Sequence, residues 1–180
     1  MYKKIVLAMA SLLMATVAGA ATPQEQAFLD QYGLANKTAK EMIDTIDQST
    51  QARPLPYSAS VTSTELKFSD GQEVYTYPVG DQFYLSIAPY VTYTHDCFNH
   101  SLSGCKAELV NTPYQVTVKS DDGKVIFDET VTSFSNGFYG LWLPRDISGT
   151  IEVDYNGRKG SSAFTTGEKS QTCMTTIQLK

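Results

Sequence analysis

Apolar residues near the N-terminus of this chain recur every three or four positions, which predicts two amphipathic helices. The first helix begins at the capping pair Thr22 and Glu25 and ends at Gly33. The second runs from about Lys37 to Gln48, with apolar side chains along one stripe. Together these segments predict a short helical hairpin.

After residue 60 the apolar pattern changes to period two, which is typical of β-strands. A connector over residues 49–60 contains two prolines and has neither period. Asp-Gly and Asn-Gly pairs then separate segments rich in Val, Thr, Tyr and Phe, and the clearest hairpin joins residues 114–119 to 125–130. We therefore predict a mainly β fold with a short N-terminal helical hairpin (α+β), whose strands form an antiparallel β-sandwich or a partly open barrel.

The first twenty residues have the pattern of a secretory leader. Lys3 and Lys4 precede a mainly apolar run over residues 5–17, and small residues follow up to Ala20. The run is too short for a membrane span, which needs about 20 apolar residues. The predicted organisation is a cleaved signal peptide over residues 1–20, a helical segment with its proline-containing linker over 21–60, and a β domain over 61–180.

Charge and motif content narrow the possible functions. The 180 residues include 14 basic and 19 acidic side chains, and loss of Lys3 and Lys4 with the leader leaves a net charge of −7. Such a surface repels phosphate backbones and anionic lipids, so we expect no nucleic-acid partner and no membrane association after leader cleavage. The sequence has no nucleophilic-serine elbow, phosphate loop, dinucleotide fingerprint or His-Glu-x-x-His motif. We therefore do not expect an enzyme.

Sulfur and imidazole ligands are concentrated in two short segments. These five residues are His95, Cys97, His100, Cys105 and Cys173. Continued alternation around residue 90 predicts a strand that places His95 and Cys97 on one inward face. The parity of the last strand predicts that Cys173 points inward and Met174 does not.

Thiolates and imidazoles together suit soft or borderline ions such as Cu(I) and Zn(II), and disfavour calcium and magnesium. The residues alone support a structural disulfide about equally well, either Cys97 with Cys105 or one of these with Cys173. An odd number of cysteines leaves one thiol over in an oxidising compartment. A Cys-x-x-Cys redox pair is missing.

Several sequence motifs carry a resemblance to a known family. They are LSIAPY at 85–90, THDC at 94–97, HSL at 100–102, NGF at 136–138, GLWLPRD at 140–146 and CMTT at 173–176. In this order and register the chain resembles the CueP family of periplasmic copper-resistance proteins.

The resemblance implies a metal site formed by Cys97, Cys105 and Cys173 together with His95 and His100. It further implies a periplasmic protein of Gram-negative type that holds copper as Cu(I) and contributes to copper resistance and copper homeostasis. Delivery of copper to a periplasmic Cu,Zn superoxide dismutase and reduction of Cu(II) by the thiols are also implied. A periplasmic disulfide isomerase is the natural thiol reductant.

Two other functions stay open at this point, and so does the oligomeric state. A thiol-disulfide oxidoreductase would use one cysteine pair without metal, whereas a disulfide-stapled or zinc-stabilised interaction module would use the cysteines for stability. Zinc is also the expected competitor for a copper site. Because the helical hairpin has too small an apolar face to be stable alone, we expect it to pack on the β domain or to exchange in a homodimer.

Overall fold

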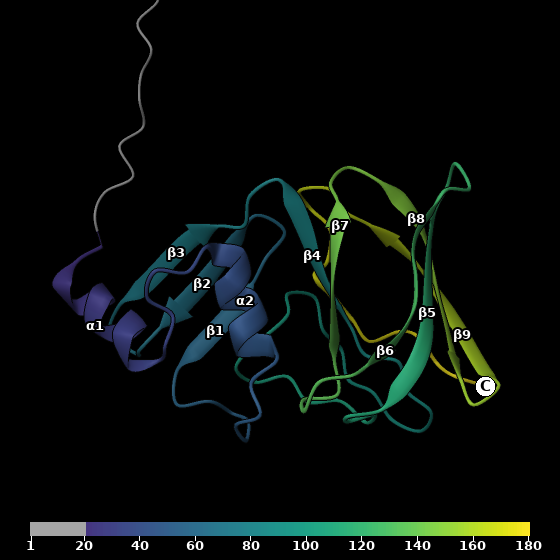
Figure 1. Ribbon diagram of the computed structural model, residues 1–180, viewed down its shortest axis with the longest axis horizontal. Helices are drawn as coiled ribbons and strands as arrows, with labels where there is room; N and C mark the ends of the chain where they lie inside the picture. The colour runs from purple at the N-terminus through teal and green to yellow at the C-terminus, as the bar shows by residue number, and fades with distance from the viewer. Residues whose placement is uncertain (1–20) are drawn as a thin grey trace, which may run out of the picture.

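The computed structural model describes residues 21–180, in which two short helices precede ten strands (Figure 1). The predicted signal peptide at 1–20 lies outside the described residues. Within the described part, no helix combines the length and the apolar character needed to cross a membrane.

Both predicted helices are present, and each begins at a capping box. The Thr22 hydroxyl accepts a hydrogen bond from the Glu25 backbone N–H, and the Thr38 hydroxyl accepts one from the Glu41 backbone N–H. Each box satisfies backbone donors that the first helical turn leaves free. The helices are α1 (Pro23–Gln31) and α2 (Ala39–Asp47).

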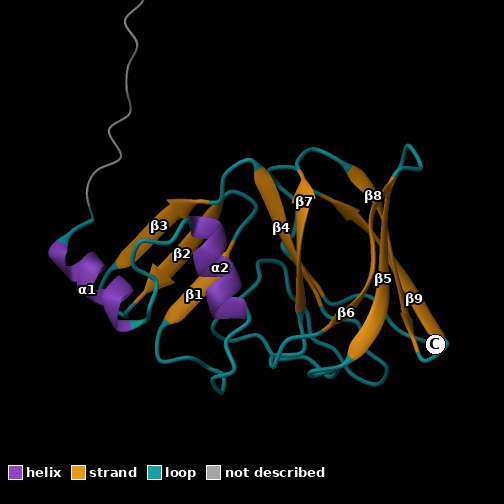
Figure 2. Cartoon of the chain, viewed as in Figure 1, coloured by secondary structure: helices purple, strands orange, loops and turns teal. Residues whose placement is uncertain are grey.

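The helices pack on an antiparallel three-stranded sheet, at the left in Figure 2. Its strands are β1 (Ser58–Val61), β2 (Glu65–Ser69) and β3 (Val74–Pro78), hydrogen-bonded in that order. Phe28 of α1 and Ile43 of α2 share one buried cluster with Phe68 of β2, so the helical pair has its apolar partner within the chain. The predicted boundary at residue 60 lies inside β1.

The remaining strands form two further sheets that enclose the main core, as the sandwich prediction requires (Figure 1). None of the sheets in the described residues closes into a barrel. The first sheet has the order β10–β4–β7, from β4 (Gln82–Ile87), β7 (Tyr139–Pro144) and β10 (Cys173–Met174). The second has the order β6–β5–β8–β9, from β5 (Pro113–Ser120), β6 (Val125–Thr132), β8 (Ser148–Tyr155) and β9 (Arg158–Thr165). The β5–β6 hairpin is the one predicted from Asp122-Gly123.

Two details of the strand prediction are wrong. The strand expected to continue through Cys97 ends at Ile87, and the following residues form a loop whose segment 92–96 is exposed. The Glu108 carboxylate accepts the backbone N–H groups of Val91 and Thr92, which removes donors that a sheet ladder would need. Met174 is fully buried rather than outward-facing, because β10 has a core on each face.

Candidate metal centre

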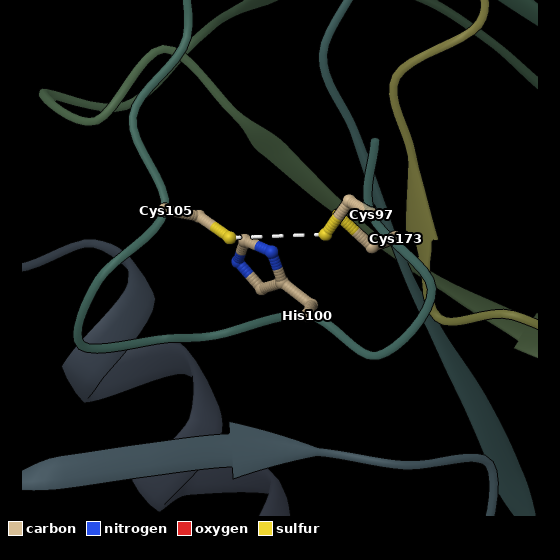
Figure 3. Close-up of side chains that lie close together, drawn as sticks. All are labelled: Cys97, His100, Cys105 and Cys173. Carbon is tan, nitrogen blue, oxygen red and sulfur yellow. Dashed lines mark hydrogen bonds between the residues drawn. A yellow bond between two sulfur atoms is a disulfide. The ribbon is translucent and has the colours of Figure 1, made fainter. Parts of the chain in front are cut away.

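Four of the five predicted ligand residues converge between the β4–β5 loop and the C-terminal strand (Figure 3). One donor atom from each of Cys97, His100, Cys105 and Cys173 lies within 4.8 Å of the others. The loop supplies the first three residues and β10 supplies Cys173. The fold therefore brings together Cys97 and Cys173, which are 76 residues apart in the sequence.

Two of the three sulfur atoms are joined, since Cys97 and Cys173 form a disulfide. Cys105 is free and partly exposed, and its Sγ lies 3.8 Å from Cys97 Sγ. Figure 3 shows the Cys105 sulfur facing the disulfide, with the His100 ring beside the line between them. Of the pairings left open by the sequence, the chain adopts Cys97 with Cys173 and leaves Cys105 as the odd thiol.

Hydrogen bonds from distant segments hold this loop in place. His100 makes an antiparallel bridge to Val61, whose N–H donates to the His100 carbonyl at 2.9 Å. The His100 N–H donates to the Thr172 hydroxyl at 3.0 Å, and that hydroxyl donates to the Val61 carbonyl at 2.6 Å. The Phe98 carbonyl accepts from the N–H groups of Thr172 and Cys173. The backbone on both sides of the cluster is thus fixed by β1 and the approach to β10.

His95 lies outside the four-residue cluster. Its side chain is exposed, and its ring nitrogens lie 3.2 Å from the carbonyl oxygens of Asp96 and Lys106. The expectation that His95 shares an inward strand face with Cys97 is wrong because this segment is a loop, where period two does not apply. A role for His95 in metal binding stays a prediction.

His100 is fully buried, and its two ring nitrogens have different surroundings. Nε2 lies 2.9 Å from the Asp47 carboxylate, whereas Nδ1 has no hydrogen-bond partner among the described residues. Burial alone lowers the pKa of His100. The charge and hydrogen bond of Asp47, with a smaller contribution from Cys105, outweigh burial and raise that pKa to about 9. A buried nitrogen without a partner is costly, so Nδ1 is the polar atom in this site that most needs a ligand.

Asp47, the last residue of α2, is the buried acceptor behind His100, and the sequence prediction missed it. It also accepts hydrogen bonds from the Tyr84 hydroxyl at 2.5 Å and from Asn136 Nδ2 at 2.8 Å. Burial raises the pKa of Asp47. The charge and hydrogen bond of His100, the Tyr84 hydrogen bond and the charge of Arg53 outweigh burial and lower that pKa below its usual value. The sequence carried one signal for Asp47. A negative charge in the last turn of a helix is unfavourable because it opposes the helix dipole, and no basic residue in this turn offsets it.

The donor set fits a soft metal ion. Two donors that each lie about 2.3 Å from one ion are at most about 4.6 Å apart, so donors spread over 4.8 Å need only small movements to share it. Ala88 and Phe138 pack against Cys173 in a small apolar cluster that shields this side of the sulfurs from water. With the disulfide reduced, the cluster offers three thiolates and one imidazole nitrogen, the ligand types that suit Cu(I) and Zn(II).

Comparison with known proteins places this geometry in context. The sequence matches, over residues 41–178, the model of a family described as "Periplasmic copper-binding protein CueP". The fold is similar to a solved structure titled "Crystal Structure of S.CueP", with a TM-score of 0.87 and 56% sequence identity. That alignment covers 89% of this chain and 100% of the other. No curated protein matches the sequence significantly.

Proposed function

Because the chain belongs to the CueP family of periplasmic copper-binding proteins, we propose that it holds copper as Cu(I) through the sulfurs of Cys97, Cys105 and Cys173. His100 Nδ1 is the fourth donor of the proposed site. The observation that carries the proposal is the convergence of these four donor atoms within 4.8 Å, one of them a buried nitrogen that has no hydrogen-bond partner in the part of the chain that the structure describes. The predicted signal peptide and a periplasm of Gram-negative type belong to the same proposal.

Copper binding in this site requires the reduced form. Opening the Cys97–Cys173 disulfide takes two electrons and two protons, which a periplasmic dithiol of the disulfide-isomerase class can supply while it becomes a disulfide itself. In the reverse direction, two thiols that close this disulfide release two protons and two electrons, enough to reduce two Cu(II) to two Cu(I). Closing the disulfide removes two sulfurs from the site. Each reduced chain therefore reduces a fixed number of Cu(II) ions, and it does not act as an enzyme in this step.

The partly exposed Cys105 supports a role in copper transfer. A recipient that offers its own ligands can approach this sulfur first, while Cys173 stays buried behind it. We propose a periplasmic Cu,Zn superoxide dismutase as the recipient and copper resistance as the result. Mixing the Cu(I)-loaded chain with copper-free dismutase should restore dismutase activity, and unchanged activity would remove the delivery proposal while leaving copper binding intact.

A homodimer also stays a proposal, and one reason for it no longer applies. The apolar faces of α1 and α2 are covered by β1–β3 of the same chain, so they do not need a second copy. Light scattering over a concentration series measures the mass in solution and tests the homodimer directly. A monomer mass at high micromolar concentration would contradict the dimer.

The proposed function is tested by an oxygen-free titration of fully reduced residues 21–180 with Cu(I) against a chromogenic chelator, with Zn(II) as competitor. We expect one tight Cu(I) per chain that zinc does not displace, and a large loss of affinity in Cys97→Ser, Cys105→Ser and Cys173→Ser. Met174→Leu is the matched control. It removes a fully buried sulfur at the position next to Cys173 and keeps the side-chain volume nearly constant, and this side chain packs in the main core between the two sheets and not against the cysteines.

Three outcomes favour other functions. Displacement of copper by zinc favours a zinc-stabilised fold. Serine variants that unfold more easily but keep their Cu(I) affinity favour a structural disulfide. Turnover on a disulfide substrate without added metal favours a thiol-disulfide oxidoreductase.

A further inference from the structure

Asp47 connects the N-terminal helices to the copper site. It is fully buried at the last residue of α2, and its carboxylate accepts the Nε2–H of His100 at 2.9 Å. Asn136 and Tyr84 donate to the same carboxylate from the turn before β7 and from β4, and Ser86 adds a longer contact at 3.3 Å. Four segments that are far apart in sequence therefore meet at one carboxylate.

We propose that Asp47 is a positioning residue of the copper site, which holds the His100 ring so that Nδ1 faces the sulfurs. This inference rests on the proposed function, because it takes His100 as a copper ligand. A histidine that binds a metal through one nitrogen usually donates its other N–H to a carboxylate or carbonyl, which fixes the ring and raises its basicity. Asp47 provides that acceptor from an element that contributes no metal ligand.

The ring has little freedom to turn away from this orientation. Its backbone is held by Val61 and Thr172, and the ring packs against Phe138 in a tilted arrangement with ring centroids 4.7 Å apart. Donation of Nε2–H to Asp47 then leaves Nδ1 on the side of the cysteines, without a hydrogen-bond partner among the described residues. Nδ1 gives up its proton when it binds copper. A purely structural His–Asp pair would be expected to satisfy both nitrogens, whereas here Nδ1 is buried without a hydrogen-bond partner within residues 21–180.

Arg53 ties the helix end that carries this carboxylate to the loop that carries His100. The guanidinium of Arg53 donates to the Ile46 and Asp47 carbonyl oxygens at 3.0 Å and to the Leu102 carbonyl at 3.1 Å. These bonds satisfy carbonyls at the end of α2 and join that helix end to the loop carrying His100 and Cys105. The end of α2 is therefore part of the site, although the sequence places it in a separate helical segment.

The first test compares Asp47→Asn with Asp44→Asn. Asp44 lies one turn earlier on α2 and accepts a hydrogen bond from Trp142 Nε1 at 2.9 Å, so its replacement also removes a hydrogen-bonded carboxylate from this helix without touching His100. Loss of an outer carboxylate partner typically lowers metal affinity about 10- to 100-fold. We expect a loss of this size in Cu(I) affinity for Asp47→Asn and less than about twofold for Asp44→Asn.

A second comparison separates positioning from general damage to the fold. In a His100→Ala background Asp47 has no ring to position, so Asp47→Asn should leave the remaining Cu(I) affinity unchanged. An equal loss of affinity with and without His100 would overturn the proposal, because Asp47 would then act on the fold and not through the ring.

The unmodified chain gives a test that does not depend on variants folding. Cu(I) is diamagnetic, so ¹⁵N NMR can follow both His100 nitrogens in the loaded protein. We expect Nε2 to carry the proton and Nδ1 to shift on Cu(I) addition. Coordination through Nε2, or no shift at either nitrogen while the three cysteines still bind Cu(I), would overturn the role of Asp47 but keep the sulfur site. Loss of cysteine-dependent Cu(I) binding altogether would instead overturn the proposed function.

Discussion

The buried Asp47–His100 pair should make the metal-free chain lose stability as the pH rises above neutrality. Both side chains are fully buried, and the pKa of His100 is raised from 6.5 to about 9 by Asp47 against the opposing effect of burial. Since the folded pKa is the higher one, the folded chain holds a proton that the unfolded chain releases between pH 6.5 and about 9. The stabilisation is complete below pH 6.5 and is lost as the pH rises through about 9.

The size of this effect follows from the shift. One proton of difference gives a slope of about −1.4 kcal/mol per pH unit in the free energy of unfolding, which amounts to roughly 3 kcal/mol across the window. Burial raises the pKa of Asp47, but His100, the Tyr84 hydroxyl and Arg53 outweigh burial and lower this pKa in the fold. Its contribution is therefore present above pH 3.8 and is lost as the pH falls through the lowered value.

Urea unfolding of the oxidised, metal-free chain at pH 6, 7, 8 and 9 measures this slope. His100→Gln is the control, because glutamine can still donate to Asp47 but does not titrate. Both proteins should carry Cys105→Ser, which prevents thiol-disulfide exchange at high pH. Asp47 is the main group that raises the His100 pKa, so the slope should persist after that change. Cys105 also raises this pKa, so its replacement should narrow the pH window and lower the total below the value given above. Equal slopes in the two proteins would refute the assignment of a charged His100 in the folded chain.

Three further changes test other parts of the structure. Cys97→Ser should lower the free energy of unfolding of the oxidised chain, measured in urea, by about 4.5 kcal/mol, the loop-closure value for the 76-residue separation from Cys173. A loss below about 1 kcal/mol would contradict a structural contribution of the disulfide. Gly140→Ala should lower the melting temperature by several degrees, because a methyl group there collides with the Tyr84 hydroxyl. It should also weaken Cu(I) binding, because this hydroxyl donates to Asp47. Unchanged values would mean that Tyr84 can move freely. His95→Ala should change the Cu(I) affinity measured by chelator competition less than about threefold, because the exposed His95 ring lies outside the cluster. A loss of about tenfold would show that His95 is a ligand.

The elements that sequence reasoning found are those with strong local signals. The capping box at Thr22 and Glu25 and the Asp122-Gly123 turn fix a helix start and a hairpin through interactions a few residues apart. The strand predicted through Cys97 failed because its end is set by a distant side chain. Glu108 takes the backbone donors of Val91 and Thr92, and alternation alone carries no trace of that contact.

The candidate site divides in the same way. Residue type alone selected the three cysteines and both histidines, because few other side chains suit a soft metal ion. It could not separate His100, which lies in the cluster, from His95, which lies outside it. The pairing of Cys97 with Cys173 and the part played by Asp47 depend on how β10 and α2 approach the loop, which is tertiary packing. An acidic residue at a helix end is only a weak signal in the sequence, and the complete burial of Asp47 becomes visible only in the fold.

The central claim is that reduced Cys97, Cys105 and Cys173 hold Cu(I) together with His100. X-ray absorption at the copper edge of the Cu(I)-loaded, fully reduced chain tests this most directly, because the fine structure reports the kind and number of atoms around the metal. We predict a shell dominated by sulfur at about 2.2–2.3 Å, close to zinc-thiolate distances, with one nitrogen contribution that disappears in His100→Ala. A shell made only of nitrogen and oxygen would contradict the claim.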